Sequence, residues 1–282
     1  MTIEPSRKRR LLIYTDLDGT LLDHDSYDTS ATASLRQQLK QLGVPVVWNT
    51  SKTAAELESL RLSLEHTDPY IVENGAALYF PDESTQQPKM TFGPGHDHIM
   101  TCLEGVRRQF RFKGFHDMSV AEVAAATGLD EGDAALAKQR QFSEPLTWQD
   151  SPGKMSDFLA AMADCGLHVL RGGRFVHILG EFNKATPMAW LNDYYATQWD
   201  ATVDTVALGD SQNDIAMLQA ADRAYLIRSP AHVTPQINGQ ANIRIAKGYG
   251  PEGWAEAMAA EVDALMTPQT PPDDAIKTSL PG

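Results

Sequence analysis

Two aspartates, Asp16 and Asp18, stand directly after a short apolar run and have the types and spacing that chemistry would need. The run, residues 11–14, is typical of a strand buried on both faces of a parallel sheet. Ligands bind at the carboxyl ends of such strands, where two crowded carboxylates repel each other unless they share a cation. A plain acidic turn is the alternative, but the order strand, Asp, apolar residue, Asp, Gly, Thr is much narrower than an acidic cluster. The motif therefore predicts a cation site or a reactive carboxylate.

Hydroxyl side chains follow a second apolar run, residues 44–48. Thr50 and Ser51 stand at the end of this run, and Thr53 precedes a helical pattern. A hydroxyl in this position can cap the helix, or it can bind an anion together with backbone N–H groups. Both interpretations apply to Thr50 and Ser51, whereas capping is the simpler one for Thr53.

Two more aspartates, Asp210 and Asp214, follow the apolar run at residues 205–208 and lead into a helix. Right-handed crossovers place the carboxyl ends of parallel strands at one edge of the sheet. Three or four carboxylates gathered there form an oxygen-only site suited to Mg²⁺. Such a cation also offsets the repulsion between an anionic nucleophile and a phosphate, so the pattern predicts a magnesium-dependent phosphoryl site.

Alternating strand and helix patterns predict an α/β fold with a doubly wound parallel sheet. The strands are expected at residues 11–14, 44–48, 70–72, 77–80, 205–208, 225–227 and 243–245. Helices are expected at residues 31–42, with Leu42 on the buried face, after Thr53, after Lys184, after Asp214 and at 252–266. The Asn74-Gly75 pair predicts a hairpin between two of the strands, and a plain turn is the alternative to a site role for Asn74.

A segment rich in Pro, Ser, Gln and Gly, residues 81–95, marks the start of an insert with a different pattern. We expect helices at 96–110, 120–127, 133–140 and 155–165, then a hairpin at 167–179 that turns at Gly172-Gly173. The whole chain then divides into a flexible arm (1–10), a core (11–83 and 181–266), an α+β insert (84–180) and a disordered tail (267–282).

Composition excludes several classes of function. The chain has 282 residues and a formal net charge of -13, which argues against non-specific binding to nucleic acid or an anionic membrane. The basic residues 7–10 are expected to be a solvated arm, with a nucleic-acid or lipid patch as the alternative. The two cysteines, Cys102 and Cys165, are too few for a disulfide framework, and no signal peptide or membrane span is expected. We therefore expect a cytoplasmic protein.

Four motifs together resemble the haloacid dehalogenase superfamily of phosphatases. They are DLDGT at 16–20, Thr50, the isolated Lys184 and GDSQND at 209–214. NTSKT (49–53), ENGAALYFP (73–81), AKQRQFSEP (137–145) and GGRFVHILG (172–180) resemble the mannosyl-3-phosphoglycerate phosphatase family within it. The resemblance spans residues 11–265 and implies a Rossmann-like core with an inserted α+β cap of type C2B.

The resemblance also implies roles for the core residues. Asp16 is the expected nucleophile, and Asp18 is the expected general acid and base. Thr50, Ser51 and Lys184 are expected to bind the phosphate. The implied magnesium site is formed by Asp16, Asp18 through its carbonyl, Asp210 and Asp214, and Asp214 is either an outer ligand or orients Lys184. Ala185 stands where the family usually has Gly, and an ordinary helix residue is the alternative for Lys184.

Substrate contacts are expected from the insert, because a glycosyl phosphoglycerate carries a carboxylate as well as a phosphate. The candidates are Asn74, Lys138, Arg140, Ser143, Glu144, Arg171, Arg174, His177 and Asn213. The alternative for each arginine and for Lys138 is a solvated surface position, and for His177 a structural role in a strand.

The expected activity is hydrolysis of a small phosphorylated sugar or glycerate substrate, most simply mannosyl-3-phosphoglycerate to the compatible solute mannosylglycerate. Glucosyl-3-phosphoglycerate, sucrose phosphate or another hexose phosphate are alternatives within the same chemistry. From other classes, a signalling receiver domain and a catalytically silent sugar-phosphate binder remain open. A receiver has about 120 residues and no insert, and a silent binder would not need both Asp16 and Asp18.

Overall fold

The computed structural model describes residues 9–81, 87–171, 174–237 and 240–267. Its larger sheet has eight strands in the order β12-β11-β10-β1-β2-β3-β4-β5. These are β1 (Arg9–Thr15), β2 (Val46–Asn49), β3 (Tyr70–Val72), β4 (Ala77–Tyr79), β5 (Met90–Thr91), β10 (Thr202–Gly209), β11 (Arg223–Arg228) and β12 (Ile243–Tyr249). Neighbours from β12 to β3 are parallel, and β4 and β5 are antiparallel additions at one edge. The strand order reverses between β1 and β10, which is where doubly wound sheets bind ligands. The predicted α/β fold is confirmed.

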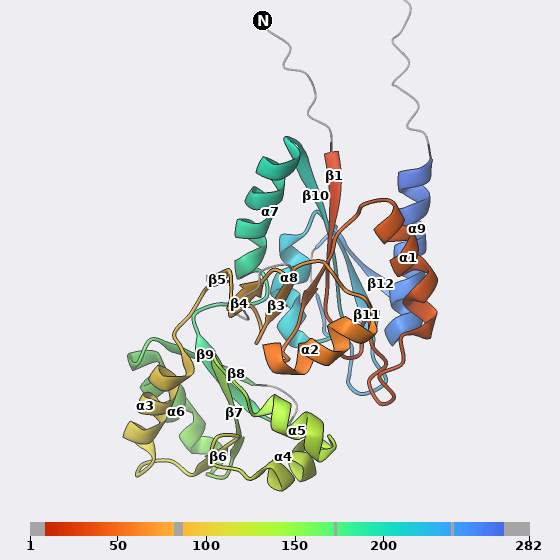
Figure 1. Cartoon of the computed structure of the whole chain (residues 1–282). Coiled ribbons are helices and arrows are strands. Elements are labelled where there is room, and N and C mark those ends of the chain that lie inside the picture. Colours follow the sequence, from red (N-terminus) through yellow and green to blue (C-terminus); the bar gives the residue numbers. More distant parts are fainter. Residues whose placement is uncertain (1–8, 82–86, 172–173, 238–239, 268–282) are drawn as a thin grey trace, which may run out of the picture.

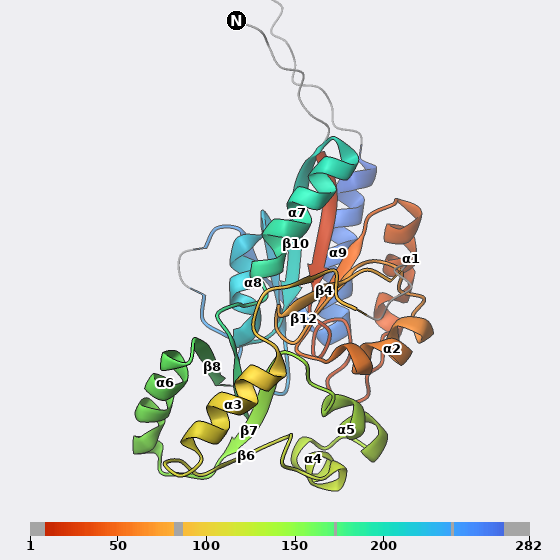
Figure 2. The ribbon, with the colours of Figure 1, turned by 60° about the vertical axis from the view of Figure 1, so that its left-hand side comes forward.

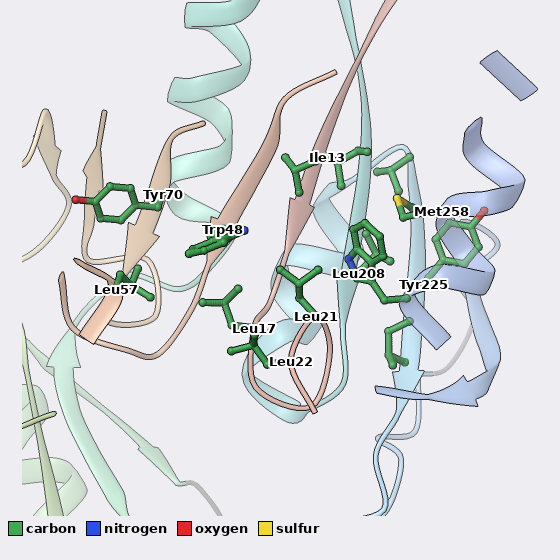
Figure 3. Close-up of a cluster of buried hydrophobic side chains, with 14 of the residues drawn as sticks. Ile13, Leu17, Leu21, Leu22, Trp48, Leu57, Tyr70, Leu208, Tyr225 and Met258 are labelled. Atoms are coloured by element: carbon green, nitrogen blue, oxygen red, sulfur yellow. The ribbon is translucent and has the colours of Figure 1, made fainter. Parts of the chain in front are cut away.

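Helices cover both faces of this sheet, as Figures 1 and 2 show. They are α1 (Ala33–Gln41), α2 (Ala54–Ser63), α7 (Thr186–Trp199), α8 (Ile215–Ala220) and α9 (Gly250–Met266), with short 3-10 turns at Ser30–Thr32 and Gln212–Asp214. Alternate residues of β1 point to opposite faces. Ile13 packs with Met258 of α9 in the core drawn in Figure 3, whereas Leu12 packs with Met188 of α7. Because β1 is buried on both faces, the groups at its end are held firmly.

A smaller antiparallel sheet has the strand order β6-β7-β9-β8. Its strands are β6 (Phe112–Gly114), β7 (Ser143–Trp148), β8 (Leu167–Arg171) and β9 (Val176–Gly180). Its helices are α3 (His96–Val106), α4 (Val120–Thr127), α5 (Glu131–Ala137) and α6 (Met155–Asp164), with a 3-10 turn at Pro152–Lys154. We call this unit the cap domain. Figures 1 and 2 show it beside the end of the larger sheet toward which β1 and β10 run.

Two strands of the cap domain, β6 and β7, were not expected from the sequence. β6 has only three residues and ends in Gly114, and β7 begins Ser143-Glu144-Pro145, residue types that are rare in strands. Pro145 is tolerated because its strand pairs with β9 there, while the pairing with β6 starts at Leu146.

Several element boundaries differ from those expected. Arg9 and Arg10 are not part of an arm, because they pair with Thr202 and Val203 in the sheet. The insert was expected from residue 84, yet β5 (90–91) pairs with β4 in the larger sheet.

The expected helix 96–110 ends at Val106, and Phe110 is buried in the turn that follows. Leu42 was placed on a buried helix face but is 45% exposed. The turn at 172–173 and the tail from 268 lie outside the described residues.

Two negative expectations concern the described part of the chain. Cys102 and Cys165 are both free cysteines, the first buried and the second half-buried. Among the helices of the described residues, none has the length and apolar character needed to cross a membrane.

Candidate active site

The end of β1 positions Asp16. Its backbone N–H donates to the carbonyl of Leu208 (2.9 Å), which continues the parallel pairing with β10 by one residue. The hydroxyl of Thr15 donates to the Asp16 carbonyl (2.7 Å) and accepts from the indole N–H of Trp254 (3.1 Å). Asp16 is only 5% exposed, so its carboxylate sits at the sheet edge with a fixed backbone and little water.

Lys184 bridges two of the carboxylates. Its Nζ lies 2.6 Å from Oδ1 of Asp16 and 2.6 Å from Oδ1 of Asp214, and the side chain is fully buried. The carbonyl of Lys184 accepts from the Asn49 amide at the end of β2 (2.7 Å), which fixes the segment before α7. Ala185 has φ −80°, a conformation open to any residue, so this position does not require the glycine usual in the family.

The segment from Gly209 to Asp214 is folded around one carboxylate, and we call it the acid loop. Oδ2 of Asp214 accepts from the N–H groups of Asp210 (3.0 Å) and Ser211 (2.9 Å) and from the Ser211 hydroxyl (3.1 Å). A Cβ on Gly209 would lie 2.4 Å from the Asp214 Cβ, so only glycine fits there. Because Lys184 takes the other oxygen, the contacts of Asp214 suit an orienting residue.

A divalent cation fits this group of acids. Ligand oxygens of Asp16, Asp210 and Asp214 all lie within 4.8 Å of one another. Burial, followed by the charge of Asp214, raises the pKa of Asp16, and burial also raises the pKa of Asp210. Gly19 makes room for the group, because a Cβ there would lie 2.5 Å from Oδ2 of Asp210. The donors are all oxygen and crowded with negative charge, as a hard cation such as Mg²⁺ prefers.

The raised pKa values predict how metal binding depends on pH. Folded-state pKa values above the unfolded values favour the metal-free fold at low pH, and this contribution is lost as pH rises through the folded values. Mg²⁺ needs the deprotonated acids, so the increase in Tm that it causes should grow as the pH rises from mildly acidic to mildly alkaline. Thermal unfolding with and without Mg²⁺ across this range measures the difference. A constant increase would contradict the assigned site.

Lys52 pairs with the second aspartate of the motif. Its Nζ is 3.1 Å from Oδ1 of Asp18 and 3.8 Å from Oε1 of Glu56, and it lies 4.9 Å from the centre of the Tyr27 ring. Burial lowers the pKa of Lys52, but the charges of Asp18 and Glu56 outweigh burial and raise it overall. No role for Lys52 beyond its place in a motif could be predicted, because its partner Asp18 is remote along the chain.

His232 is a further group that sequence reasoning missed. Its Nε2 lies 2.8 Å from Oδ2 of Asp210, and this hydrogen bond raises the pKa of the imidazole. No spacing or neighbouring motif marks His232, since it comes from the chain after β11. Only the fold brings it to Asp210.

The structure also places the expected phosphate-binding residues at this edge. Thr50 is fully buried, its hydroxyl accepts from the Lys52 N–H (3.2 Å), and its carbonyl accepts from the Asn74 N–H (2.9 Å). The side chains of Asn74 and Asn213 are joined by a hydrogen bond (2.9 Å). Thr53 caps α2 through a reciprocal bond with Glu56, as expected. We call residues 50–52 the phosphate loop.

Arg140 of the cap domain contacts this loop, and His177 lies on the adjoining sheet of the cap domain. Nη1 of Arg140 donates to the carbonyl of Ser51 (2.8 Å) and to the hydroxyl of Ser143 (3.3 Å). His177 pairs with Pro145 across β7 and β9, so it shares a face of the smaller sheet with Ser143. Burial and then the charge of Arg140 lower the pKa of His177 to about 4, which keeps its ring neutral.

Lys138 and Glu144 were expected to contact the substrate, but both bond to other residues of the cap domain. The ammonium of Lys138 donates to the carbonyls of Phe115 and Met118. Glu144 points to the opposite face from Ser143, where it contacts His96 (2.8 Å). Alternation along β7 decides this, because neighbouring side chains face opposite ways.

Arg174 donates to the carbonyl of Thr127 (2.7 Å), the last residue of α4, and is exposed. Arg171 is also exposed, at the end of β8. These two arginines therefore have the solvated surface positions that were the alternative for them.

Fold and site together define a haloacid dehalogenase-like hydrolase, and the family model of that description matches residues 13–123. The chain is 36% identical over 261 residues to a glucosyl-3-phosphoglycerate/mannosyl-3-phosphoglycerate phosphatase of Methanococcoides burtonii, covering 88% of this chain and 95% of that protein. It is 33% identical over 259 residues to the phosphatase of the same name from Persephonella marina, covering 88% and 96%. The chain therefore belongs to this phosphatase family of the haloacid dehalogenase-like hydrolases, and it is a phosphoric monoester hydrolase.

A solved structure shares the whole fold. The crystal structure of a Thermoplasma acidophilum protein matches with a TM-score of 0.67 at 19% identity, over 90% of this chain and 99% of that one. The resemblance inferred from the motifs is confirmed by these findings.

Proposed function

We propose that the protein is a magnesium-dependent phosphatase that hydrolyses mannosyl-3-phosphoglycerate to mannosylglycerate in the cytoplasm. The observation that carries the proposal is the arrangement of Asp16, Lys184 and Asp214 at the point where the strand order reverses. It supports a nucleophilic carboxylate beside a buried cation, which is the arrangement that attack on an anionic phosphate requires. The names of the two curated relatives support the substrate.

The reaction proceeds in two displacements. An oxygen of Asp16 attacks phosphorus, the bond from phosphorus to the leaving oxygen breaks, and Asp18 gives its proton to the departing alkoxide. In the second step Asp18 accepts a proton from water, the water oxygen attacks the phosphorus of the aspartyl phosphate, and Asp16 is released. Thr50, Ser51 and Lys184 bind the phosphoryl oxygens in both steps.

The metal would be held by Asp16, Asp210 and the carbonyl of Asp18. When bound, it neutralises charge on the phosphate and on the carboxylates around it. Asp214 orients Lys184 through the 2.6 Å contact and shapes the acid loop through its other oxygen.

The non-phosphate part of the substrate faces the cap domain. Arg140 can pair with the glycerate carboxylate, and Ser143, His177, Asn74 and Asn213 can bond sugar hydroxyls. The neutral ring of His177 suits a hydroxyl better than an anion. Its buried Nδ1 has no partner among the described residues, so it is ready to bond a sugar.

Substrate profiling tests this assignment. The purified protein with Mg²⁺ is assayed for phosphate release from mannosyl- and glucosyl-3-phosphoglycerate, sucrose phosphate and simple hexose phosphates. We expect the highest kcat/KM with one of the two glycosyl phosphoglycerates. An equal or higher kcat/KM with an unrelated hexose phosphate would contradict the substrate assignment but not the phosphatase chemistry.

A further inference from the structure

Glu73 is a buried carboxylate that none of the roles above uses. It lies in the turn between β3 and β4 and is 1% exposed. Oε1 accepts from the N–H of Gln141 (2.9 Å), and Oε2 accepts from the N–H of Phe142 (3.1 Å) and the hydroxyl of Ser143 (2.6 Å). All three donors belong to the start of β7 and the two residues before it. A carboxylate of the larger sheet is therefore bound by the backbone of the cap domain.

The backbone of Glu73 has an unusual conformation for its residue type. Its φ is +50°, a left-handed value that side chains other than Asn and Asp rarely adopt. The turn is joined to the phosphate loop, because the N–H of Glu73 donates to the carbonyl of Lys52 (3.0 Å). Turns of this kind usually carry Asn, Asp or Gly, none of which has a side chain as long as that of Glu. The reach to the cap domain explains why a glutamate stands there.

The turn also reaches the acid loop. Asn74 accepts at its Oδ1 from the Asn213 amide (2.9 Å), and Asn213 in turn accepts from the Ser211 hydroxyl. Residues 73 and 74 thus join three parts of the molecule: the phosphate loop through backbone bonds, the acid loop through Asn74, and the cap domain through Glu73. If the cap domain moves at this turn, the cap domain changes its position relative to both the phosphate loop and the acid loop.

We propose that Glu73 is a positioning residue that sets the cap domain over the phosphate loop and so makes the enzyme select esters whose non-phosphate part reaches the cap. This inference rests on the proposed function. Ser143, which Glu73 binds, also accepts from Arg140, and Arg140 donates to Ser51 of the phosphate loop. The carboxylate therefore fixes Ser143 and, through it, Arg140, which contacts the phosphate loop. An ester too small to contact these cap groups should be hydrolysed equally well with or without the Glu73 carboxylate.

The test is Glu73→Gln. Its amide keeps one acceptor but turns an NH₂ group toward donors, so at least one charged hydrogen bond is lost. The variant should still fold, because Thr53 bonds the Leu136 carbonyl (3.1 Å) and Tyr79 bonds Gln141 (3.3 Å) independently. Loss of one charged hydrogen bond corresponds to roughly a ten- to hundredfold change in an equilibrium. We expect kcat/KM for the best glycosyl phosphate to fall by that factor, while p-nitrophenyl phosphate keeps nearly the wild-type value.

Two further measurements sharpen the test. Glu104→Gln, at an exposed glutamate of α3, is the matched control and should leave kcat/KM unchanged for both substrates. Amide exchange at Gln141 and Phe142, which needs no activity, should be faster in Glu73→Gln than in the wild type. Equal losses with both substrates, or no loss with either, would overturn the inference. If the best substrate of the wild type is a different sugar phosphate, only the proposed function is revised, because the comparison uses that substrate.

Discussion

Asp16→Asn is expected to eliminate phosphate release, with kcat lower by roughly 10⁴-fold or more, because no neighbouring group can replace a covalent nucleophile. The amide keeps the size of the side chain and one acceptor oxygen for Lys184, so substrate should still bind. The steady-state rate of phosphate release, with substrate and Mg²⁺ both saturating, measures the loss.

The stability of metal-free Asp16→Asn should not fall, although its activity does. Burial and the neighbouring Asp214 already make ionised Asp16 unfavourable, as its raised pKa shows. The Tm of metal-free Asp16→Asn should therefore be no lower than that of the wild type. Asp193→Asn, an exposed position on α7, is the control and should keep full activity. Retained activity in Asp16→Asn would refute the nucleophile assignment.

Lys184→Met is expected to lose both activity and stability. Removing one partner of a buried ion pair typically costs about 3–5 kcal/mol, because the other charge is left buried without compensation. Here two carboxylates, Asp16 and Asp214, would face each other without the ammonium that lies 2.6 Å from each. Chemical denaturation of the metal-free protein measures the stability loss, and phosphate release measures the activity.

A double variant separates the charge effect from a packing effect. Adding Asp16→Asn to Lys184→Met removes one of the two unpaired carboxylates, so the double variant should be more stable than Lys184→Met alone. Mg²⁺ should also recover part of the lost stability in Lys184→Met, since a cation can offset the same charges. The double variant should also be more stable than the sum of the two single changes predicts, and strict additivity would mean that Lys184 stabilises the fold through packing and not through its charge pairs.

Three residues of this site could be predicted from the sequence because each of them follows a buried strand. Asp16, Thr50 and Asp210 come directly after β1, β2 and β10, and the parallel sheet brings these strand ends together whatever the details of packing. Lys184 could be placed only through the family resemblance, since no strand ends just before it in the larger sheet.

The other residues of the site could not be predicted, because they depend on contacts between residues far apart in the sequence. His232 and Lys52 reach aspartates through loops, and the role of Glu73 appears only when the cap segment at 141–143 is packed against it. In the cap domain, β7 starts with residues of low strand propensity and is held by its neighbours β6 and β9. That missed strand also decides the face of each side chain, which is why Ser143 and Glu144, adjacent in sequence, point to opposite sides.

Asp16 is the residue that we expect to take the phosphoryl group. Acid-quenched single turnovers, followed by borohydride reduction and peptide mass spectrometry, locate an aspartyl phosphate as homoserine. We predict homoserine at position 16 in the wild type, trapped only in the presence of substrate and Mg²⁺, and none in Asp16→Asn. Homoserine at another aspartate, or turnover in the wild type with no trapped acyl phosphate, would show that Asp16 is not the nucleophile.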